Sequence, residues 1–240
     1  MCALKADRPR LAEMVAESPA GETFLVPAQL CLPVMSQCSS NGHALRVLFG
    51  LIWLSAEVMR SGAQVCFRAS MAEIRIASGF EGYGKDVPVT EAIEHLKEEV
   101  CVFPEGKPVE IFQELNIVDR EDKILEWVFT EEFTNIFVSP RAFSIVSISE
   151  IIRMKSGLDF FLYLQVRRIW KMRKRAVDLE VRDLLFAADL PDNTPFQRIS
   201  ERVRRTTTRL ETLVGKPIKV ITKKDRGARH HRAICLDLRS

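Results

Sequence analysis

Residues 195–214 read PFQRISERVRRTTTRLETLV, and this stretch decides the fold of the C-terminal part of the chain. At about 100° per residue, one side of a helix gathers the apolar residues into a core face. These are Phe196, Ile199, Val203, Leu210, Leu213 and Val214. The opposite side carries a row of arginines, Arg198, Arg202, Arg205 and Arg209, with Arg204 beside it and Thr208 and Thr212 adding hydroxyl groups. The pattern predicts an amphipathic helix with a basic exposed face.

A basic hairpin is predicted directly after this helix. Gly215-Lys216-Pro217 is a strong stop signal, and Ile218–Thr222 and Ala233–Leu238 then have the alternation of strands. The segment between them is rich in cations: Lys223, Lys224, Arg226, Arg229 and Arg232. We expect these side chains on a wing, where they can reach phosphates or a minor groove. The alternative is a loop that only keeps the protein soluble.

Before the helix, the sequence predicts a turn, a short helix and a long helix. Asp189–Pro195 reads as the turn, with Thr194 as N-cap and Pro195 at the first helical position. The segments upstream read as a short apolar helix (Leu179–Ala188), a short strand (Ala176–Asp178) and a long amphipathic helix (Leu158–Lys174). A helix-turn-helix followed by a β-hairpin is a winged-helix module, which we place at 147–240.

The N-terminal part repeats this plan at an offset of 110 residues, which aligns Trp53 with Tyr163 and Ile74 with Leu184. The first copy has predicted helices at His43–Arg60, Ser70–Ser78 and Val89–Val100, the last with Thr90 as N-cap, and a strand at Gln64–Arg68. Further strand-like patches lie at Val109–Phe112, Leu125–Phe129 and Asn135–Val138. The predicted fold class is α+β with two tandem winged-helix domains, 41–146 and 147–240, after an N-terminal arm at 1–40.

The two copies differ in charge. Residues 151–240 hold 22 Lys and Arg against 10 Asp and Glu, a net charge of +12, whereas residues 1–150 carry −9. Such asymmetry points to a polyanion as the partner of the basic part. A helix fits the major groove of DNA, and Arg suits both guanine edges and phosphates. We therefore predict that the arginine row and the wing bind double-stranded DNA; a solvated charged face is the alternative.

A third basic cluster, Arg167-Arg168 with Lys171–Arg175, ends the long helix of the second copy. Cations are favoured at a helix C-terminus, so this cluster either stabilises the helix or contacts the DNA backbone. In the first copy, Val89–Val100 is acidic and suits a phosphate-lined groove poorly. We expect the N-terminal domain to mediate protein contacts, including a homodimer, or to touch DNA through other elements. Its apolar residues Val47, Leu51 and Leu54 are available for the core and for a second protomer.

The sequence predicts neither a cofactor nor an enzyme. The six cysteines form no C-x-x-C pair, and His230-His231 lacks a third ligand at a suitable spacing, so no metal site is expected. Gly79–Asp86 fits the start of a P-loop but has Asp86 where Ser or Thr would hold magnesium, and it follows a helix. No apolar stretch is long enough for a membrane span and no signal peptide is visible, so a cytoplasmic protein without a membrane partner is expected.

From Ile148 to Leu238 the chain resembles the plasmid replication initiation (Rep) proteins of the iteron-binding, tandem winged-helix type. The resemblance rests on Ile148–Lys155 leading into the long helix, on Leu184 and Leu185, on Val203 to Leu210, and on the closing DRGARHHRAICLDL. It implies binding to origin repeats, opening of the adjacent duplex and recruitment of host replication proteins such as an initiator and a helicase. It also implies that the N-terminal module dimerises. A winged-helix transcriptional regulator and a chromosome-partition scaffold are the rival functions.

Overall fold

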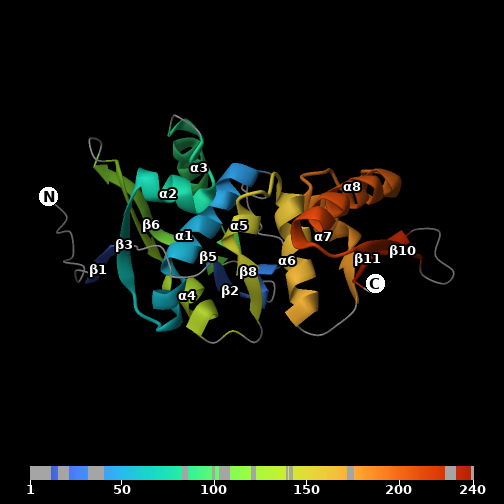
Figure 1. Cartoon of the computed structure of the whole chain (residues 1–240), viewed down its shortest axis with the longest axis horizontal. Coiled ribbons are helices and arrows are strands. Elements are labelled where there is room, and N and C mark those ends of the chain that lie inside the picture. Colours follow the sequence, from blue (N-terminus) through green and yellow to red (C-terminus); the bar gives the residue numbers. More distant parts are fainter. Residues whose placement is uncertain are drawn as a thin grey trace, which may run out of the picture.

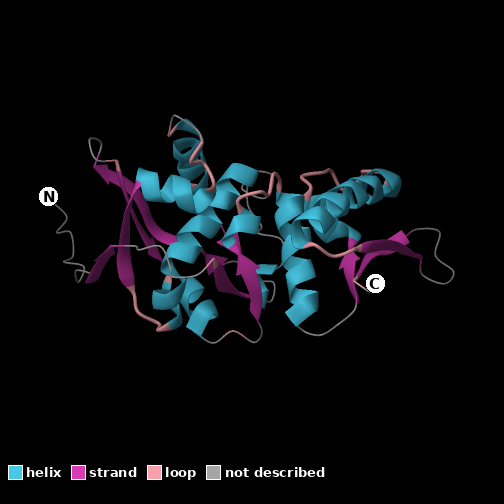
Figure 2. Cartoon of the chain, viewed as in Figure 1, coloured by secondary structure: helices cyan, strands magenta, loops and turns pink. Residues whose placement is uncertain are grey.

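Two units with the same order of elements lie side by side along the long axis of the molecule (Figure 1). The computed structural model describes residues 12–15, 22–31, 41–82, 86–98, 101–102, 109–119, 123–138, 140, 143–171, 176–224 and 231–238. Helices and strands are mixed in both units, as Figure 2 shows, so the chain is an α+β protein.

The C-terminal unit combines three main helices with a three-stranded antiparallel sheet of order β10-β11-β9. Its elements in chain order are α6 (Gly157–Lys171), β9 (Ala176–Glu180), α7 (Val181–Ala187), α8 (Phe196–Val214), β10 (Lys219–Lys224) and β11 (His231–Asp237). The predicted helices and strands of this unit are confirmed, with boundaries that differ by a few residues.

The N-terminal unit has the same plan. Its corresponding elements are α1 (Gly42–Arg60), β3 (Val65–Ser70), α2 (Met71–Ser78), α3 (Val87–Lys97), β6 (Phe112–Asp119) and β7 (Ile124–Phe129). The strand β7 lies between β6 and β3, just as β11 lies between β10 and β9. Moving β3 along the chain by 110 residues places it on β9, and the same shift places α2 on α7. The repeat predicted from the sequence is therefore present in the element order and in the strand pairing.

Several elements surround this repeated plan. They are β1 (Ala12–Val15), β2 (Thr23–Pro27), η1 (Ala28–Cys31), β4 (Cys101–Val102), β5 (Val109–Glu110), α4 (Glu131–Val138), β8 (Phe143–Ser147) and α5 (Ile148–Ile151). The predicted arm 1–40 contains two strands, each paired with a strand of the N-terminal unit. β1 runs parallel to β3, and β2 runs antiparallel to β8. The predicted strand at Asn135–Val138 is wrong, because those residues end the helix α4.

Local signals explain where the helices begin and end. The Ser70 hydroxyl and the Glu73 carboxylate form a reciprocal capping box at the start of α2. The Asn41 side chain accepts hydrogen bonds from the first amides of α1. Two predicted N-caps are wrong. Thr90 lies inside α3, whose N-cap is Asp86, and Pro195, not Thr194, occupies the N-cap position of α8.

The helix α1 forms the centre of the N-terminal unit. Val47 and Leu51 are fully buried and Leu54 is nearly so, which confirms their predicted place in the core and leaves none of them exposed for a second protomer. By length and mean hydropathy α1 would pass as a membrane span, but 78% of that window is buried inside the fold. Its apolar character is therefore accounted for by the protein core.

The two units share one continuous core across the segment that joins them. The rings of Phe49 in α1 and Phe160 in α6 stack with centroids 5.4 Å apart. A Cβ atom on Gly42 would lie 2.3 Å from the carbonyl oxygen of Lys155, so this close approach requires glycine. The predicted boundary between residues 146 and 147 falls within β8, which pairs with β2. The units are thus tightly joined and not separated by a linker.

Candidate nucleic-acid interface

The helix α8 is placed by contacts on one face and leaves the other face to solvent. Ile199, Val203 and Leu210 are buried, and Phe196, Leu213 and Val214 pack partly buried against the same core. The predicted core face is confirmed in full. The helix ends at Gly215, whose φ of +67° closes the last turn. The Glu211 carboxylate accepts a hydrogen bond of 2.6 Å from the amide of Ile218, which fixes the start of β10 against the end of α8.

All five predicted arginines of α8 are exposed. Arg209 has an ion-pair partner, and the other four are Arg198, Arg202, Arg204 and Arg205. Among the residues that the structure describes, no hydrogen bond or ion pair of their side chains is found. A guanidinium presents five N–H donors in a planar fork that matches carboxylate, phosphate and guanine edges. This face therefore offers unengaged donors on a regular helical surface.

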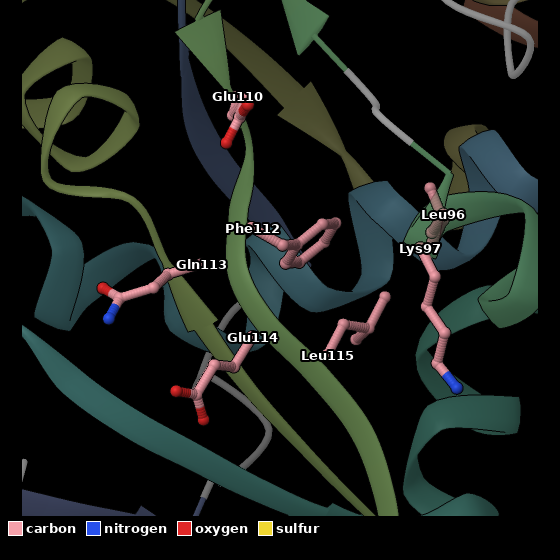
Figure 3. Close-up of a pocket in the computed structure, with 7 residues that line it drawn as sticks. All are labelled: Leu96, Lys97, Glu110, Phe112, Gln113, Glu114 and Leu115. Carbon is pink, nitrogen blue, oxygen red and sulfur yellow. The ribbon is translucent and has the colours of Figure 1, made fainter. Parts of the chain in front are cut away.

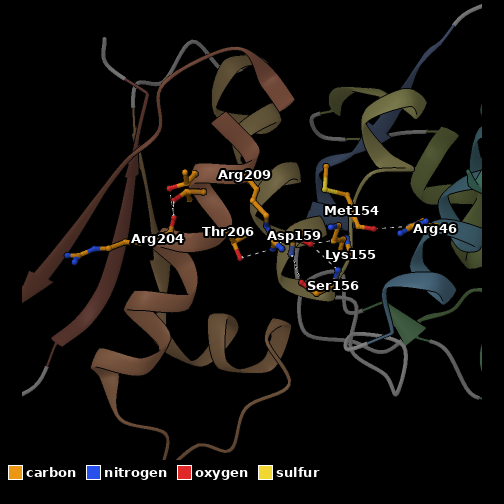
Figure 4. A network of polar contacts seen from close by, with 10 residues as sticks. Arg46, Met154, Lys155, Ser156, Asp159, Arg204, Thr206 and Arg209 are labelled. Carbon is orange, nitrogen blue, oxygen red and sulfur yellow. Dashed lines mark hydrogen bonds and ion pairs between the residues drawn. The ribbon is translucent and has the colours of Figure 1, made fainter. Parts of the chain in front are cut away.

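Arg209 differs from the other arginines of the row. Its guanidinium forms an ion pair with Asp159 of α6, whose side chain is only 5% exposed, and it also donates to the Thr206 hydroxyl at 3.4 Å (Figure 4). The predicted role of Arg209 in DNA binding stays a prediction, but its guanidinium already has a carboxylate partner within the protein. Its partner comes from another helix, which spacing along α8 could not show. Arg204 points away from this network, toward the opposite flank of the helix.

Thr208 is exposed on α8, as predicted, but its hydroxyl proton has a partner. The Thr208 hydroxyl donates to the carbonyl oxygen of Arg204 at 3.1 Å, within its own helix. In this arrangement Thr208 can accept a hydrogen bond from a ligand but does not offer its proton.

The hairpin β10–β11 extends from the C-terminal unit (Figure 1). Lys223 forms an ion pair of 2.7 Å with Asp178 of β9, and both side chains are about half exposed. The hydrogen bond from Lys223 lowers the pKa of Asp178 and raises that of Lys223. Lys223 is thus partly neutralised across the sheet. The side chains of Lys224 and Arg232, together with Arg226, Arg229 and His230, lie outside the described residues.

The basic end of α6 has a structural component. Arg167 forms an ion pair with the Glu150 carboxylate and donates to the Tyr163 hydroxyl at 3.2 Å. Burial raises the pKa of Tyr163, whose hydroxyl also donates to Glu150. Arg167 therefore ties α6 to α5, whereas residues 172–175 lie outside the described part of the chain.

An open hollow beside α8 was not anticipated from the sequence. It has a volume of about 250 Å³ and lies between the end of α8 and the segment that precedes α6. Its lining residues are Arg153, Met154, Lys155, Asp159, Arg209, Leu210, Thr212 and Leu213. The available signal was the pair of cations Arg153 and Lys155 just before α6, but only the fold brings them next to α8.

The N-terminal unit presents a different surface. Glu91 and Glu94 are exposed on α3, and Glu98 is exposed at its C-cap. A hollow of about 180 Å³ between α3 and β6 is bordered by the carboxylates of Glu110 and Glu114 and by Lys97 (Figure 3). Lys97 is itself paired with Glu94 at 2.8 Å. These features favour cations over phosphates, in agreement with the predicted contrast between the two units.

Comparisons with known proteins bear on the fold. No protein-family model matches the sequence, and no curated protein matches it. Among solved structures, the chain is similar to a Pi initiator protein in complex with iteron DNA, with a TM-score of 0.64 and 10% sequence identity. The match covers 91% of this chain and 98% of that one. The chain therefore shares the fold of that initiator protein, which agrees with the fold that its resemblance to the Rep family implies.

Proposed function

We propose that this protein binds double-stranded DNA sequence-specifically and initiates plasmid replication by recognising repeats at an origin. The observation that carries the proposal is the row of exposed arginines on α8, unengaged by other described residues, in a fold shared with an initiator solved on iteron DNA. In this proposal both units are winged-helix domains, and α8 is the recognition helix of the second.

The proposed mode of binding follows from the shape and charge of the C-terminal unit. The helix α8 enters the major groove, where Arg198, Arg202 and Arg205 reach guanine edges or phosphates. The hairpin β10–β11 lies along the adjacent backbone or minor groove and carries the cations around its tip. Phosphate contacts position the protein, and base contacts supply the specificity.

The N-terminal unit serves protein contacts in this proposal. Its acidic α3 suits a protein partner better than a phosphate-lined groove. We assign to it homodimerisation and the recruitment of host replication proteins, an initiator and a helicase, in the cytoplasm. The proposed activity is binding and assembly, without a cofactor and without catalysis by this chain.

The test is a selection followed by a salt titration with the full-length protein. Duplexes that the protein recovers from a random-sequence library serve as the specific probe, and a scrambled duplex serves as the reference. If about six phosphates are contacted, log K falls with log salt at a slope of about −5. Recovery of no preferred sequence, or an affinity that does not change with salt, contradicts the proposal.

A transcriptional regulator would use the same DNA-binding surface, so binding alone does not separate the two functions. The deciding measurement is replication of a test plasmid that carries the selected sequence as tandem repeats and is supplied with this protein. Replication that depends on both the repeats and the protein supports the initiator. Repression of a reporter without replication favours the regulator, and no DNA binding at all favours the partition scaffold.

A further inference from the structure

The segment that joins the two units brings two cations to one end of the arginine row. Residues 152–156 connect α5 to α6, and Arg153 and Lys155 are exposed on them. Both side chains line the open hollow whose other wall is formed by Arg209, Thr212 and neighbouring residues of α8. The basic surface of α8 therefore continues across the hollow onto the joining segment.

A single buried carboxylate fixes this arrangement (Figure 4). Asp159 Oδ2 accepts hydrogen bonds from the backbone amides of Lys155 at 2.8 Å and Ser156 at 3.0 Å. Its Oδ1 accepts from the guanidinium of Arg209. Asp159 thus holds the joining segment and α8 together, and it neutralises one of the three cations around the hollow.

The joining segment is also held from its other side. Arg46 of α1 donates from Nε to the carbonyl oxygen of Met154 at 2.8 Å. The segment is therefore anchored to the N-terminal unit by Arg46 and to the C-terminal unit by Asp159. Arg153 and Lys155 project from a backbone fixed on both sides, which lowers the entropic cost of ordering them on a ligand.

We infer that Arg153 and Lys155 bind backbone phosphates of the duplex beside the groove that α8 enters, and that Asp159 is the positioning residue for these contacts. The inference rests on the proposed function, because it extends the same interface. The charge of the hollow favours an anionic ligand. Its lining holds three cations, Arg153, Lys155 and Arg209, and the carboxylate of Asp159, which gives a net charge of +2. In this arrangement the protein contacts the duplex on both sides of α8, through the hairpin on one side and the joining segment on the other.

The experiment compares two double variants of the full-length protein on the selected and scrambled duplexes. Arg153→Gln/Lys155→Gln removes two proposed phosphate contacts. It should make the slope of log K against log salt shallower by about 1.8 and weaken both duplexes by a similar factor. Arg60→Gln/Lys97→Gln removes the same charge from exposed sites of the N-terminal unit and should leave the slope close to that of the unaltered protein.

A third variant tests the positioning role. Asp159→Asn adds one net positive charge near the DNA, so charge alone would tighten binding to every duplex. If Asp159 positions the joining segment and α8, the ratio of specific to scrambled affinity should fall severalfold instead. Unfolding of each variant is measured in parallel, because a merely structural role would lower stability without changing that ratio in the folded protein.

The outcomes separate the two proposals. If the unaltered protein binds the selected duplex with a steep salt slope but the two double variants behave alike, the phosphate contacts are refuted and the proposed function stands. If the two double variants bind DNA alike but only Arg153→Gln/Lys155→Gln loses binding to an acidic protein, the hollow binds that protein and the inference is also overturned. If the unaltered protein binds no duplex, the proposed function fails and the inference falls with it.

Discussion

The arginines of α8 have similar spacing but different surroundings. Arg202 and Arg205 are exposed, with no ion pair among the described residues, whereas Arg209 is held by the buried carboxylate of Asp159. Exposed donors lose little free energy when they form new contacts with a base. Arg209 would first have to break its ion pair with a carboxylate that is shielded from water. We therefore expect base reading from Arg202 and Arg205 and a structural contribution from Arg209.

This difference gives a prediction for single replacements. Arg202→Ala or Arg205→Ala should cost about 1–3 kcal/mol of binding to the selected duplex and relax the preference at one base pair. Binding to the scrambled duplex should change less. Titrations against a panel of single-base variants of the selected duplex measure the effect. Equal losses on selected and scrambled duplexes would assign these arginines to phosphates.

The burial and exposure of the candidate site residues were predictable from the sequence only where one helix carries the whole pattern. The apolar and basic faces of α8 follow from periodicity alone, so Ile199, Val203 and Arg205 were placed correctly. The partners of Arg209 and Lys223 lie 50 and 45 residues away in the chain. Such pairs depend on tertiary packing, which the periodicity of the sequence does not reveal.

At the scale of elements, two glycines end helices in the same conformation but in different surroundings. Gly79 closes α2 with φ +71°, and Gly215 closes α8 with φ +67°. A Cβ atom on Gly79 would lie 2.4 Å from the Cβ of Ile152 in the joining segment, whereas nothing lies within 4 Å of a Cβ on Gly215. The two positions share a backbone requirement, and only Gly79 has a steric one in addition.

We predict that Gly215→Ala lowers the free energy of unfolding by about 1 kcal/mol, the cost of the left-handed conformation for a residue with a Cβ. Gly79→Ala should cost about 1–3 kcal/mol more, because the methyl group overpacks the contact with Ile152. Urea denaturation of both variants measures the difference, with Gly215→Ala as the matched control. Equal losses would mean that the joining segment shifts at little cost.

Most elements were predictable because capping residues and hydrophobic periodicity agree in them. The capping box of Ser70 and Glu73 and the stop at Gly215 mark helix ends directly. The strand predicted at Asn135–Val138 was wrong because a pattern of only four residues cannot distinguish a strand from the last turn of a helix. The pairing of β2 with β8 joins residues more than 100 positions apart, and no local pattern indicates such a pairing.

At the scale of the whole molecule, the core runs through both units. Phe49 stacks on Phe160, and Tyr163 of α6 accepts a hydrogen bond of 3.1 Å from the amide of Ser147 at the end of β8. The sequence indicated two domains because the plan is repeated, but repetition does not show how closely the copies pack. The shared core predicts that the two units unfold together.

This prediction can be checked in the variant Trp170→Phe, which keeps Trp53 and Trp127 in the N-terminal unit as the only tryptophans. Fluorescence then reports that unit, and circular dichroism reports helices of the whole chain. The two signals should give the same midpoint in urea. A circular dichroism transition that begins well before the fluorescence change would show that the C-terminal unit unfolds independently.

The opposite charges of the two units have a consequence for how the protein meets its partner. Residues 151–240 sum to +12 and residues 1–150 to −9. The described parts of the two units are joined through one core along the long axis (Figure 1), so two units of opposite net charge form one body. Such a body has a large electric dipole moment, so the field of a polyanion exerts both an attractive force and a torque on it. If the protein binds DNA as proposed, the molecule would turn its C-terminal unit toward the duplex before contact, so a larger share of encounters would begin in the productive orientation. Added salt should slow association both by weakening this attraction and by letting the molecule arrive unaligned.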